Sequence, residues 1–314
     1  LKQKSRLYAE DPFRNFLPSI GRLTRYRPPA ESVEKDCIIR NDTGVYEGGE
    51  ISMFYDPMIA KLCTWSSDRE KAITAMENAL DRFEIEGIGH NLPFLSAVMG
   101  HSRFKSGNIT TAFIDEEYPD GFRGVIPSDG IQDILSATAL IITRMKMKRI
   151  SERDSTFDNP VPKKDNLVIR INRENTNVTI CDHQDGYEIS LDDKMILASI
   201  KHELGDSLAE VAIDDISYAV KVNPVIGGYC LRIRGVEQIV KVMNPRTAEL
   251  ANLMPDKMPA DTSKYLLCPM PGLMVSILVS EGDVIEEGQA LAMVEAMKME
   301  NVLRAEKPGK ISKI

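Results

Sequence analysis

Tyr229-Cys230-Leu231-Arg232-Ile233-Arg234-Gly235-Val236-Glu237-Gln238-Ile239-Val240-Lys241-Val242 is the stretch that decides the fold of the middle of this chain. Apolar and polar side chains alternate from Tyr229 to Ile233, which is the period of a half-buried β-strand. The pair Arg234-Gly235 then interrupts the pattern at a position where a hairpin turn belongs. The stretch therefore predicts two antiparallel strands joined by a tight turn.

The same pattern extends toward the N-terminus. Eight short strands are predicted in all, at residues 167–171, 177–181, 187–191, 194–200, 208–213, 216–222, 229–233 and 236–242. Further turns are predicted at Asp192-Asp193 and Asp214-Asp215. Parallel strands need long crossover connections, and these connections are far too short, so the strands form an antiparallel meander.

A long helix is predicted before the eight strands, beginning at Pro127-Ser128-Asp129. Its apolar positions are Ile131, Ile134, Leu135, Leu140, Ile141, Ile142 and Met145. Because its middle is apolar on nearly every side, other parts of the protein must enclose it. We therefore expect a domain at residues 120–243 in which an eight-stranded antiparallel β-barrel wraps around the helix.

The N-terminal segment, residues 1–119, mixes strands with helices. Strands are predicted at residues 37–40 and 50–55. One helix follows the capping-box pattern from Ser67 to Glu70 and carries a stripe of apolar residues, Ile73, Met76, Leu80 and Phe83. A second short helix is predicted from Leu92 to Gly100.

The C-terminal segment begins after a predicted linker. Residues 244–264 hold three prolines and little periodicity, which indicates a semi-rigid linker. Residues 265–314 carry only short β patterns, in which Gly272-Leu273-Met274-Val275-Ser276-Ile277 is echoed by Gly309-Lys310-Ile311-Ser312-Lys313-Ile314. The second copy stops before its matching continuation, so we expect this all-β domain to be incomplete at its C-terminus. The fold class is multidomain α+β.

Composition excludes several classes of function. The net charge of -8 and the sequence pI of about 5.3 argue against nucleic acid as a partner. The basic run Arg144-Met145-Lys146-Met147-Lys148-Arg149 is a local exception, interpreted as the solvated C-terminal end of a helix. The five cysteines lack any CxxC spacing, so neither a disulfide frame nor a metal site is predicted. We predict no membrane span and no signal peptide.

Val294-Glu295-Ala296-Met297-Lys298-Met299-Glu300 is the motif that carries the chemistry. An enzyme can acylate a lysine only if its amine is exposed and held out from the protein. A hairpin tip meets that need, and Lys298 sits where one strand would turn into Asn301-Val302-Leu303. A solvated surface lysine is the plain alternative.

Ala296-Met297-Lys298-Met299 resembles the signature of biotinyl carrier domains, and Pro269-Met270-Pro271-Gly272 resembles the companion motif of that family. The resemblance implies that Lys298 carries covalent biotin, with Ala296, Met297 and Met299 around it. Lipoyl carrier domains share the fold, but their usual Asp-Lys-Ala tip is missing here. Lys298 would act as a tether and not as an acid, base or nucleophile.

Three motifs of the N-terminal segment resemble the C-terminal lobe of biotin carboxylase. They are Arg6-Leu7-Tyr8-Ala9-Glu10-Asp11-Pro12, Leu17-Pro18-Ser19 and Tyr55-Asp56-Pro57-Met58-Ile59-Ala60-Lys61-Leu62. The resemblance implies a catalytic arginine sixteen residues before Asp56, which is Arg40. A guanidinium suits this role because it stays charged and presents forked donors to an anion. A surface arginine at a strand end is the alternative.

Tyr118-Pro119-Asp120-Gly121-Phe122, the Gly89-His90-Asn91 stretch and the helix-plus-eight-strands layout resemble, within biotin-dependent acyl-CoA carboxylases, the α subunits that act on propionyl-CoA. In those proteins the middle domain docks the carboxyltransferase β subunit. The ATP-grasp body of biotin carboxylase is absent here, and Leu1-Lys2-Gln3-Lys4 is an abrupt beginning. We therefore expect a longer subunit, with ATP, magnesium and bicarbonate used by the missing portion.

The resemblance implies a ligase that carboxylates biotin on Lys298 and delivers it to the β subunit, converting propionyl-CoA to methylmalonyl-CoA. Implied partners are the β subunit, its acyl-CoA and a biotin protein ligase. The cytoplasm of a bacterium or the mitochondrial matrix of a eukaryote would house it. Alternatives are a sister enzyme for 3-methylcrotonyl-CoA or acetyl-CoA, a non-enzymatic biotinylated carrier, or a lipoyl carrier.

Overall fold

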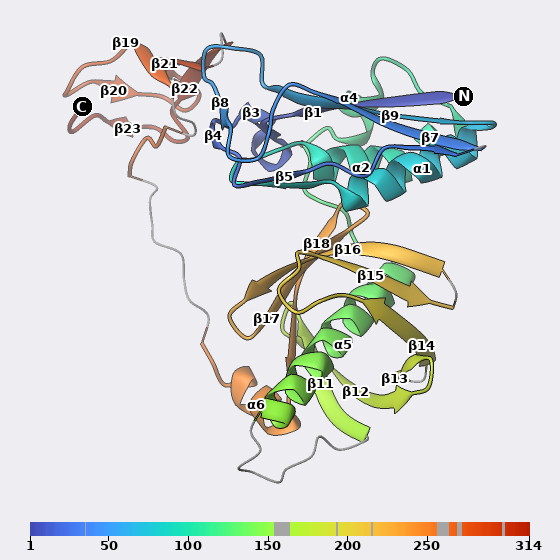
Figure 1. Ribbon diagram of the computed structural model, residues 1–314. Helices are drawn as coiled ribbons and strands as arrows, with labels where there is room; N and C mark the ends of the chain where they lie inside the picture. Colours follow the sequence, from blue (N-terminus) through green and yellow to red (C-terminus); the bar gives the residue numbers. More distant parts are fainter. Residues whose placement is uncertain are drawn as a thin grey trace.

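The computed structural model describes the 314-residue chain except for residues 35, 154–163, 193, 215, 256–263, 269–271 and 297–298. Three folded parts follow one another along the chain (Figure 1). We call them the lobe, built from β1 to α4; the barrel, built from α5 and β11 to β18; and the C-terminal domain, built from β19 to β23.

The lobe is organised around a four-stranded antiparallel sheet with the order β1-β9-β7-β6. Its strands are β1 (Lys2–Tyr8), β9 (Met58–Ser66), β7 (Cys37–Thr43) and β6 (Ser32–Glu34). Helix α1 (Arg69–Arg82) packs on one face, where Leu7, Leu62, Ile73 and Met76 are nearly fully buried. The predicted stripe on α1 is confirmed as the inner face of this helix.

Helix α1 begins one residue later than predicted. The side chain of Asp68, not that of Ser67, caps it by accepting a hydrogen bond from the backbone N–H of Lys71 at 2.7 Å. The predicted capping box at Ser67 is therefore wrong. Asp68 has the extended backbone of an N-cap residue, and a carboxylate there also complements the positive helix end.

Shorter elements complete the lobe. They are β2 (Glu10–Asp11), η1 (Pro12–Arg14), β3 (Leu17–Pro18), β4 (Gly21–Arg22), β5 (Arg25–Arg27), β8 (Glu50–Ile51), β10 (Glu84–Glu86), α2 (Leu92–Gly100), α3 (Ser102–Ser106) and α4 (Phe113–Glu117). The helix predicted from Leu92 to Gly100 is confirmed. The strand predicted at residues 50–55 is shorter, because only its first two residues pair, with β4.

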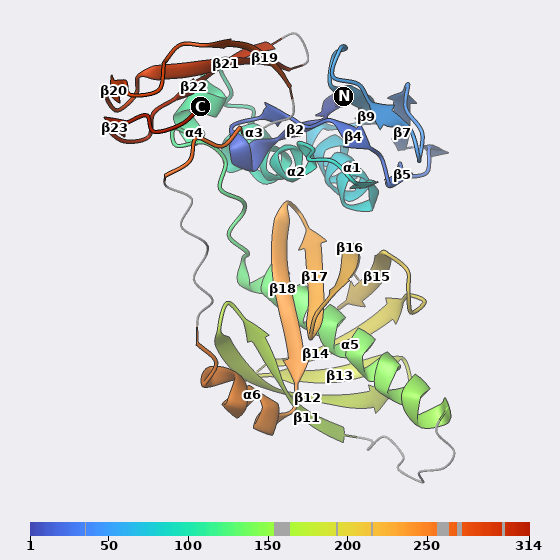
Figure 2. The same ribbon diagram turned by 90° about the vertical axis from the view of Figure 1, so that its left-hand side faces the viewer.

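The barrel confirms the prediction from the middle of the sequence. Helix α5 (Asp129–Arg153) is enclosed by a closed eight-stranded antiparallel barrel (Figures 1 and 2). Its strands are β11 (Lys164–Ile171), β12 (Glu174–His183), β13 (Gly186–Leu191), β14 (Lys194–Lys201), β15 (Leu208–Ile213), β16 (Ile216–Val225), β17 (Gly228–Ile233) and β18 (Val236–Met243). Leu135, Leu140 and Ile141 of α5 have no exposed surface and form one core with the inward side chains of the strands.

The three predicted hairpin turns pass through residues with a left-handed backbone. Asp192 and Asp214 have φ of 49°, while Arg234 and Gly235 have φ of 52° and 77°. Such turns match the right-handed twist of the strands that they join. The predicted turn positions are confirmed, although Asp193 and Asp215 lie outside the described residues.

The basic end of α5 is only in part the solvated helix end that we predicted, because Lys146 and Arg149 are exposed but Arg144 is buried. Arg144 has no exposed side-chain surface and forms ion pairs with Asp165 of β11 and Asp182 of β12. The ammonium of Lys148 also contacts Asp182, at 2.7 Å. Arg144 lies where the barrel strands surround the helix, whereas the last turn, with Arg149 and Ile150, is exposed. A count of charges along the sequence does not distinguish these two surroundings.

The predicted linker begins with a folded segment. Helix α6 (Pro245–Asn252) is capped by Asn244, which accepts a hydrogen bond from Thr247 N–H at 2.7 Å. The guanidinium of Arg170 on β11 hydrogen-bonds to Asn252, which fixes the helix on the outside of the barrel. The capping asparagine and the proline in the first turn are the local signals for this helix.

The C-terminal domain is all β. Its strands are β19 (Leu273–Ile277), β20 (Val284–Ile285), β21 (Ala290–Ala296), β22 (Met299–Arg304) and β23 (Gly309–Lys310). They form a three-stranded sheet, β19-β21-β22, and a two-stranded sheet, β20-β23. The predicted echo is confirmed as structure, because its two copies supply the edge strands β19 and β23.

Helix α1 lies between the four-stranded sheet of the lobe and the barrel (Figures 1 and 2). One side of the helix covers the sheet, and its C-terminal end contacts β16. The opposite face of the sheet therefore points away from the barrel.

Candidate functional site

The hairpin that carries Lys298 is formed by β21 and β22 of the C-terminal domain. The two strands are paired from Ala290 opposite Arg304 to Ala296 opposite Met299. Met297 and Lys298 are the two residues that connect the paired ends, and both lie outside the described residues. The last pair, Ala296 and Met299, confirms that the strands run up to either side of the connection.

Gly272, from the second carrier motif, touches the strand that leads to Lys298. A Cβ atom added at Gly272 would lie 2.6 Å from the carbonyl oxygen of Glu295 and 2.7 Å from Cγ1 of Val294. Both distances are too short for any larger residue without a shift of β21. The two motifs therefore meet in space two to three residues before the connection.

Arg40 lies on the sheet face that points away from the barrel, and it is surrounded by other cations. In the strand register, Arg40 of β7 stands opposite Cys63 of β9, which stands opposite Lys4 of β1. The neighbouring rows contain Lys2, beside Trp65, and Arg6, beside Lys61. We call the five cations of this surface, Lys2, Lys4, Arg6, Arg40 and Lys61, the basic face.

The guanidinium of Arg40 is exposed and paired. Its Nη2 donates to Oδ2 of Asp42 at 2.8 Å, and 59% of the side chain is accessible. The hydrogen bond to Asp42 raises the pKa of Arg40, so the group stays cationic. A shallow pocket of about 250 Å³ lies beside it, lined by Lys2, Ile38, Arg40, Cys63, Thr64 and Trp65. The pocket therefore has the guanidinium of Arg40 and the ammonium-bearing side chain of Lys2 in its wall.

The structure brings two carboxylase motifs together beside the basic face. The N–H of Ala9 donates to the carbonyl of Pro57 at 2.8 Å, and Tyr8 pairs with Met58 across β1 and β9. Burial, together with the nearby charge of Asp56, raises the pKa of Glu10. The carboxyl groups of Glu10 and Asp56, from two different motifs, therefore lie near each other.

Arg6 is a second arginine of the basic face, which the spacing from Asp56 does not indicate. Among the described residues, Arg6 forms no ion pair, whereas Arg40 is held by Asp42. The signal was in the sequence: Lys2, Lys4 and Arg6 alternate with residues that point into the core, which is how a strand collects charge on one side.

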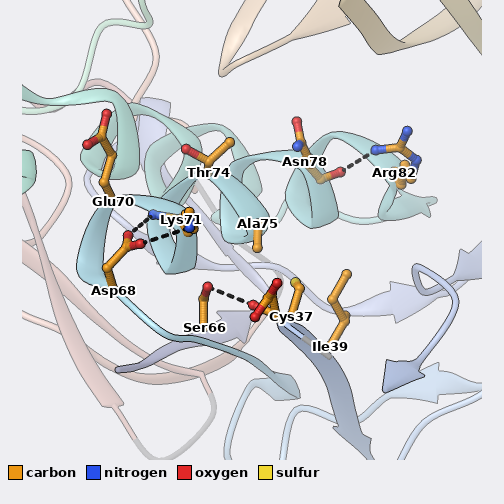
Figure 3. Close-up of a pocket in the computed structure, with 11 residues that line it drawn as sticks. Cys37, Ile39, Ser66, Asp68, Glu70, Lys71, Thr74, Ala75, Asn78 and Arg82 are labelled. Atoms are coloured by element: carbon orange, nitrogen blue, oxygen red, sulfur yellow. Dashed lines mark hydrogen bonds and ion pairs between the residues drawn. The ribbon is translucent and has the colours of Figure 1, made fainter. Parts of the chain in front are cut away.

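Another cavity lies on the other side of the sheet. It measures about 700 Å³ and opens between α1 and β7 (Figure 3). Asp68 and Lys71 face each other across its rim, and Ser66 donates to the carbonyl of Asp36 at 2.7 Å. Its polar groups thus pair with one another, and Arg40 does not line it. We assign no ligand to this cavity.

Two negative findings concern the described residues only. They contain no group of three or more His, Cys, Asp or Glu side chains placed to hold a metal ion. They also contain no helix that is both long enough and apolar enough to cross a membrane.

Comparison with known families divides the chain into three successive matches. Residues 4–116 match the biotin carboxylase C-terminal domain, residues 135–257 match the propionyl-coenzyme A carboxylase BT domain, and residues 264–314 match the family described as biotin-requiring enzyme. The matched ranges coincide with the lobe, the barrel with α6, and the C-terminal domain.

Known proteins match the chain across nearly its whole length. The propionyl-CoA carboxylase alpha chain of Ruegeria pomeroyi is 50% identical over 99% of this chain and 48% of its own length. The mitochondrial alpha chain of Rattus norvegicus is 35% identical over 98% of this chain and 42% of its own length. The chain thus spans about half the length of these relatives.

Other similarities are weaker. The alpha subunit of methylcrotonoyl-CoA carboxylase from Rattus norvegicus is 28% identical over 99% of this chain and 44% of its own length. Among solved structures, pyruvate carboxylase of Rhizobium etli is 34% identical over 45% of this chain and 13% of that chain, with a TM-score of 0.36.

Proposed function

We propose that this chain, whose three domains belong to the biotin carboxylase C-terminal, propionyl-CoA carboxylase BT and biotin-requiring families, serves as the biotin-carrying part of an acyl-CoA carboxylase α subunit. The substrate we propose is propionyl-CoA, carboxylated to methylmalonyl-CoA in an ATP-dependent reaction. Identity of 50% to a propionyl-CoA carboxylase alpha chain, against 28% to a methylcrotonoyl-CoA carboxylase subunit, supports this substrate.

The observation that carries the proposal is the hairpin of β21 and β22. Pairing that persists to Ala296 and Met299 leaves a two-residue connection, and a lysine in such a connection suits an amide-linked cofactor. Biotin attached to Lys298 would supply a carrier for the carboxyl group. The hairpin holds that attachment point, and the tether replaces a bimolecular encounter with a high effective concentration.

A Lys298→Arg variant tests the attachment. The variant keeps the positive charge and removes the acceptor amine. Both proteins are produced in a host with a biotin protein ligase, which is the modifying partner that we propose, and are compared by avidin blotting. The variant is expected to give no signal, with a circular dichroism spectrum unchanged from the parent. Equal signal from both proteins excludes Lys298 as the acceptor.

For the basic face we propose the binding of anions during biotin carboxylation, with Arg40 as the catalytic arginine. ATP, magnesium and bicarbonate would be used by the portion of the subunit that this chain does not include. Fixed cations that meet developing negative charge stabilise it without reorganisation. Arg6 lies two strands away on the same face, so we compare its role with that of Arg40.

Alanine variants of the full subunit separate the two arginines. Arg40→Ala is expected to lower bicarbonate-dependent turnover by roughly 10²–10³ with little change in melting temperature. Arg6→Ala is measured in parallel, and Arg27→Ala, which removes an exposed arginine outside the basic face, serves as the control. Full turnover in Arg40→Ala together with a large loss in Arg6→Ala would transfer the catalytic role to Arg6.

We propose further that the barrel docks a carboxyltransferase β subunit, through which the acyl-CoA enters the reaction. The match to a BT domain supports this role. The middle of α5 does not offer an apolar surface for this contact, because the barrel encloses it. Exposed apolar side chains on the outer barrel surface, among them Met195, Leu197 and Ile239, offer area that a partner would bury.

Deletion of residues 122–243 from the complete subunit tests the docking role. Biotinylation of Lys298 and carboxylation of free biotin should survive, while co-purification with the β subunit and acyl-CoA carboxylation should be lost. Assembly at normal affinity would assign docking to another domain. We place the enzyme in the cytoplasm of a bacterium or in the mitochondrial matrix of a eukaryote, in line with a bacterial relative and mitochondrial relatives.

A further inference from the structure

The lobe and the barrel meet along a surface on which charges of opposite sign face each other. The lobe supplies acidic groups from the end of α1 and from β10, and the barrel supplies most of the basic and neutral donors. The groups are Asp81 and Glu84 on the lobe and Ser207, Lys221 and Arg234 on the barrel. We call this set of residues the seam.

The centre of the seam is a bidentate contact between Arg234 and Asp81. Arg234 Nη1 lies 3.0 Å from Oδ2 of Asp81, and the backbone N–H of Arg234 donates to Oδ1 at 2.8 Å. Arg234 Nη2 also donates to Asn78 at 2.6 Å. The Asp81 side chain is only 5% exposed, so Arg234 and not water faces its carboxylate. Burial still raises the pKa of Asp81, because desolvation outweighs the attraction of Arg234.

Lys221 and one neutral donor extend the seam along the helix. The ammonium of Lys221 donates to the carbonyl of Leu80 at 3.2 Å, at the negative end of α1. Ser207 donates to Glu84. Every one of these bonds joins residues more than 120 positions apart in the sequence. Donors of the barrel thus bind acceptors on both α1 and β10 of the lobe.

Close packing accompanies the polar contacts. The hairpin tip of β17 and β18 approaches α2 so closely that a Cβ on Gly235 would lie 2.7 Å from the carbonyl oxygen of Pro93. The covalent connection between the domains is also anchored, because the buried ring of Phe122 packs against Phe13 and Phe94 at centroid distances of 5.2 and 5.5 Å. A hinge at this connection would have to break these contacts.

We propose that the seam locks the lobe and the barrel into one cooperative body, which keeps the basic face and the barrel surface in a fixed relation. The inference does not depend on the proposed reaction. It rests on complementary charge, the burial of Asp81 and the absence of space at Gly235 for movement of the hairpin tip. The two domains should therefore unfold together.

The single tryptophan of the chain makes this testable, because Trp65 lies in the lobe and its fluorescence follows lobe unfolding alone. Ile180→Ala removes a fully buried side chain on β12, in the barrel core and outside the seam. If the domains are locked, this barrel variant lowers the Trp65 melting midpoint by roughly 10 °C. Because Trp65 reports on the lobe only, the stability of the barrel is measured separately, by hydrogen exchange of its strands.

The same substitution is then made in a chain without the central contact. Asp81→Asn combined with Arg234→Asn removes both charges, and asparagine tolerates the left-handed φ of 52° at position 234. In this background Ile180→Ala should destabilise the barrel and leave the Trp65 midpoint unmoved. Arg246→Asn with Glu249→Gln, an exposed ion pair on α6, is the matched control and should preserve the coupling.

If Ile180→Ala in the parent chain does not change the melting midpoint measured by Trp65 fluorescence, the proposal is overturned. Coupling that survives in the Asp81→Asn/Arg234→Asn chain overturns the role given to these charges. If Ile180→Ala does not fold, Ile180→Val provides a smaller cavity and a smaller shift in the same direction.

Discussion

Arg144 offers the sharpest test of how the barrel holds its helix. Its side chain has no exposed surface, and its guanidinium is paired with Asp165 and Asp182, which are 16% and 36% exposed. Arg144→Met removes the cation and keeps most of the volume. Asp182 then retains Lys148, at 2.7 Å, but Asp165 loses the cation that the structure gives it. An isolated charge in a half-buried place is unfavourable.

The expected loss of stability follows from this difference between Asp182, which keeps a cation, and Asp165, which does not. Breaking a buried ion pair on one side costs about 3–5 kcal/mol, and the surviving Lys148 contact places the expected loss near the lower end, at about 3 kcal/mol. The free energy of unfolding is measured by urea titration with circular dichroism. Lys194→Met is the matched control, because Lys194 also joins a barrel strand to α5, through Asp133 at 3.2 Å, but is 59% exposed. Its loss should stay below about 1 kcal/mol.

Rescue distinguishes lost charge pairing from lost packing. Asp165→Asn in the Arg144→Met background removes the uncompensated carboxylate and should recover part of the stability. Burial alone would raise the pKa of Asp182, but hydrogen bonds from Arg144 and Lys148 outweigh it and lower that pKa. The stabilising effect of Asp182 is therefore present above its unfolded pKa and lost as the pH falls through the folded value. If Arg144→Met matches the parent in stability, or the second substitution gives no recovery, the reasoning fails.

Three further outcomes are expected. Burial lowers the pKa of Lys221 to about 8, so between pH 8 and its unfolded value near 10.5 the unfolded chain binds more protons. As the pH rises across that window, the free energy of unfolding of the parent should therefore increase by up to about 3 kcal/mol relative to that of Lys221→Met, as measured by urea titrations at each pH. A difference between the two proteins that does not change with pH would contradict this. Gly272→Val should distort β21 near Glu295 and reduce avidin signal without loss of the barrel; undiminished biotinylation would show that the contact is tolerated. Asp68→Ala should cost about 1 kcal/mol in unfolding titrations, whereas Ser67→Ala should cost almost nothing; the reverse order would restore Ser67 as the cap.

Regular patterns made the barrel predictable from the sequence. The alternation of apolar and polar residues and the turn at Arg234-Gly235 both depend on residues that are neighbours in the sequence. The hairpin of residues 229–242 was therefore predictable from its own residues. The enclosed helix followed because an all-round apolar surface can only be buried. Arg144 was misjudged because its partners, Asp165 and Asp182, come from strands 21 and 38 residues away.

The candidate site was predictable in part for the same reason. Lys298 stands in a local motif, and the paired residues Ala296 and Met299 belong to the same motif. The basic face was not predictable as a set, because it needs the register that places Lys4 and Arg40 on either side of Cys63. The spacing from Asp56 indicated Arg40 alone, and only the sheet register shows that Arg6 lies on the same face.

Site-resolved mass spectrometry of the chain, produced with an active biotin protein ligase, tests the central claim most directly. We predict one biotin per chain, on the peptide that contains Lys298. An unmodified peptide, a lipoyl group in its place, or biotin on a different lysine would contradict it.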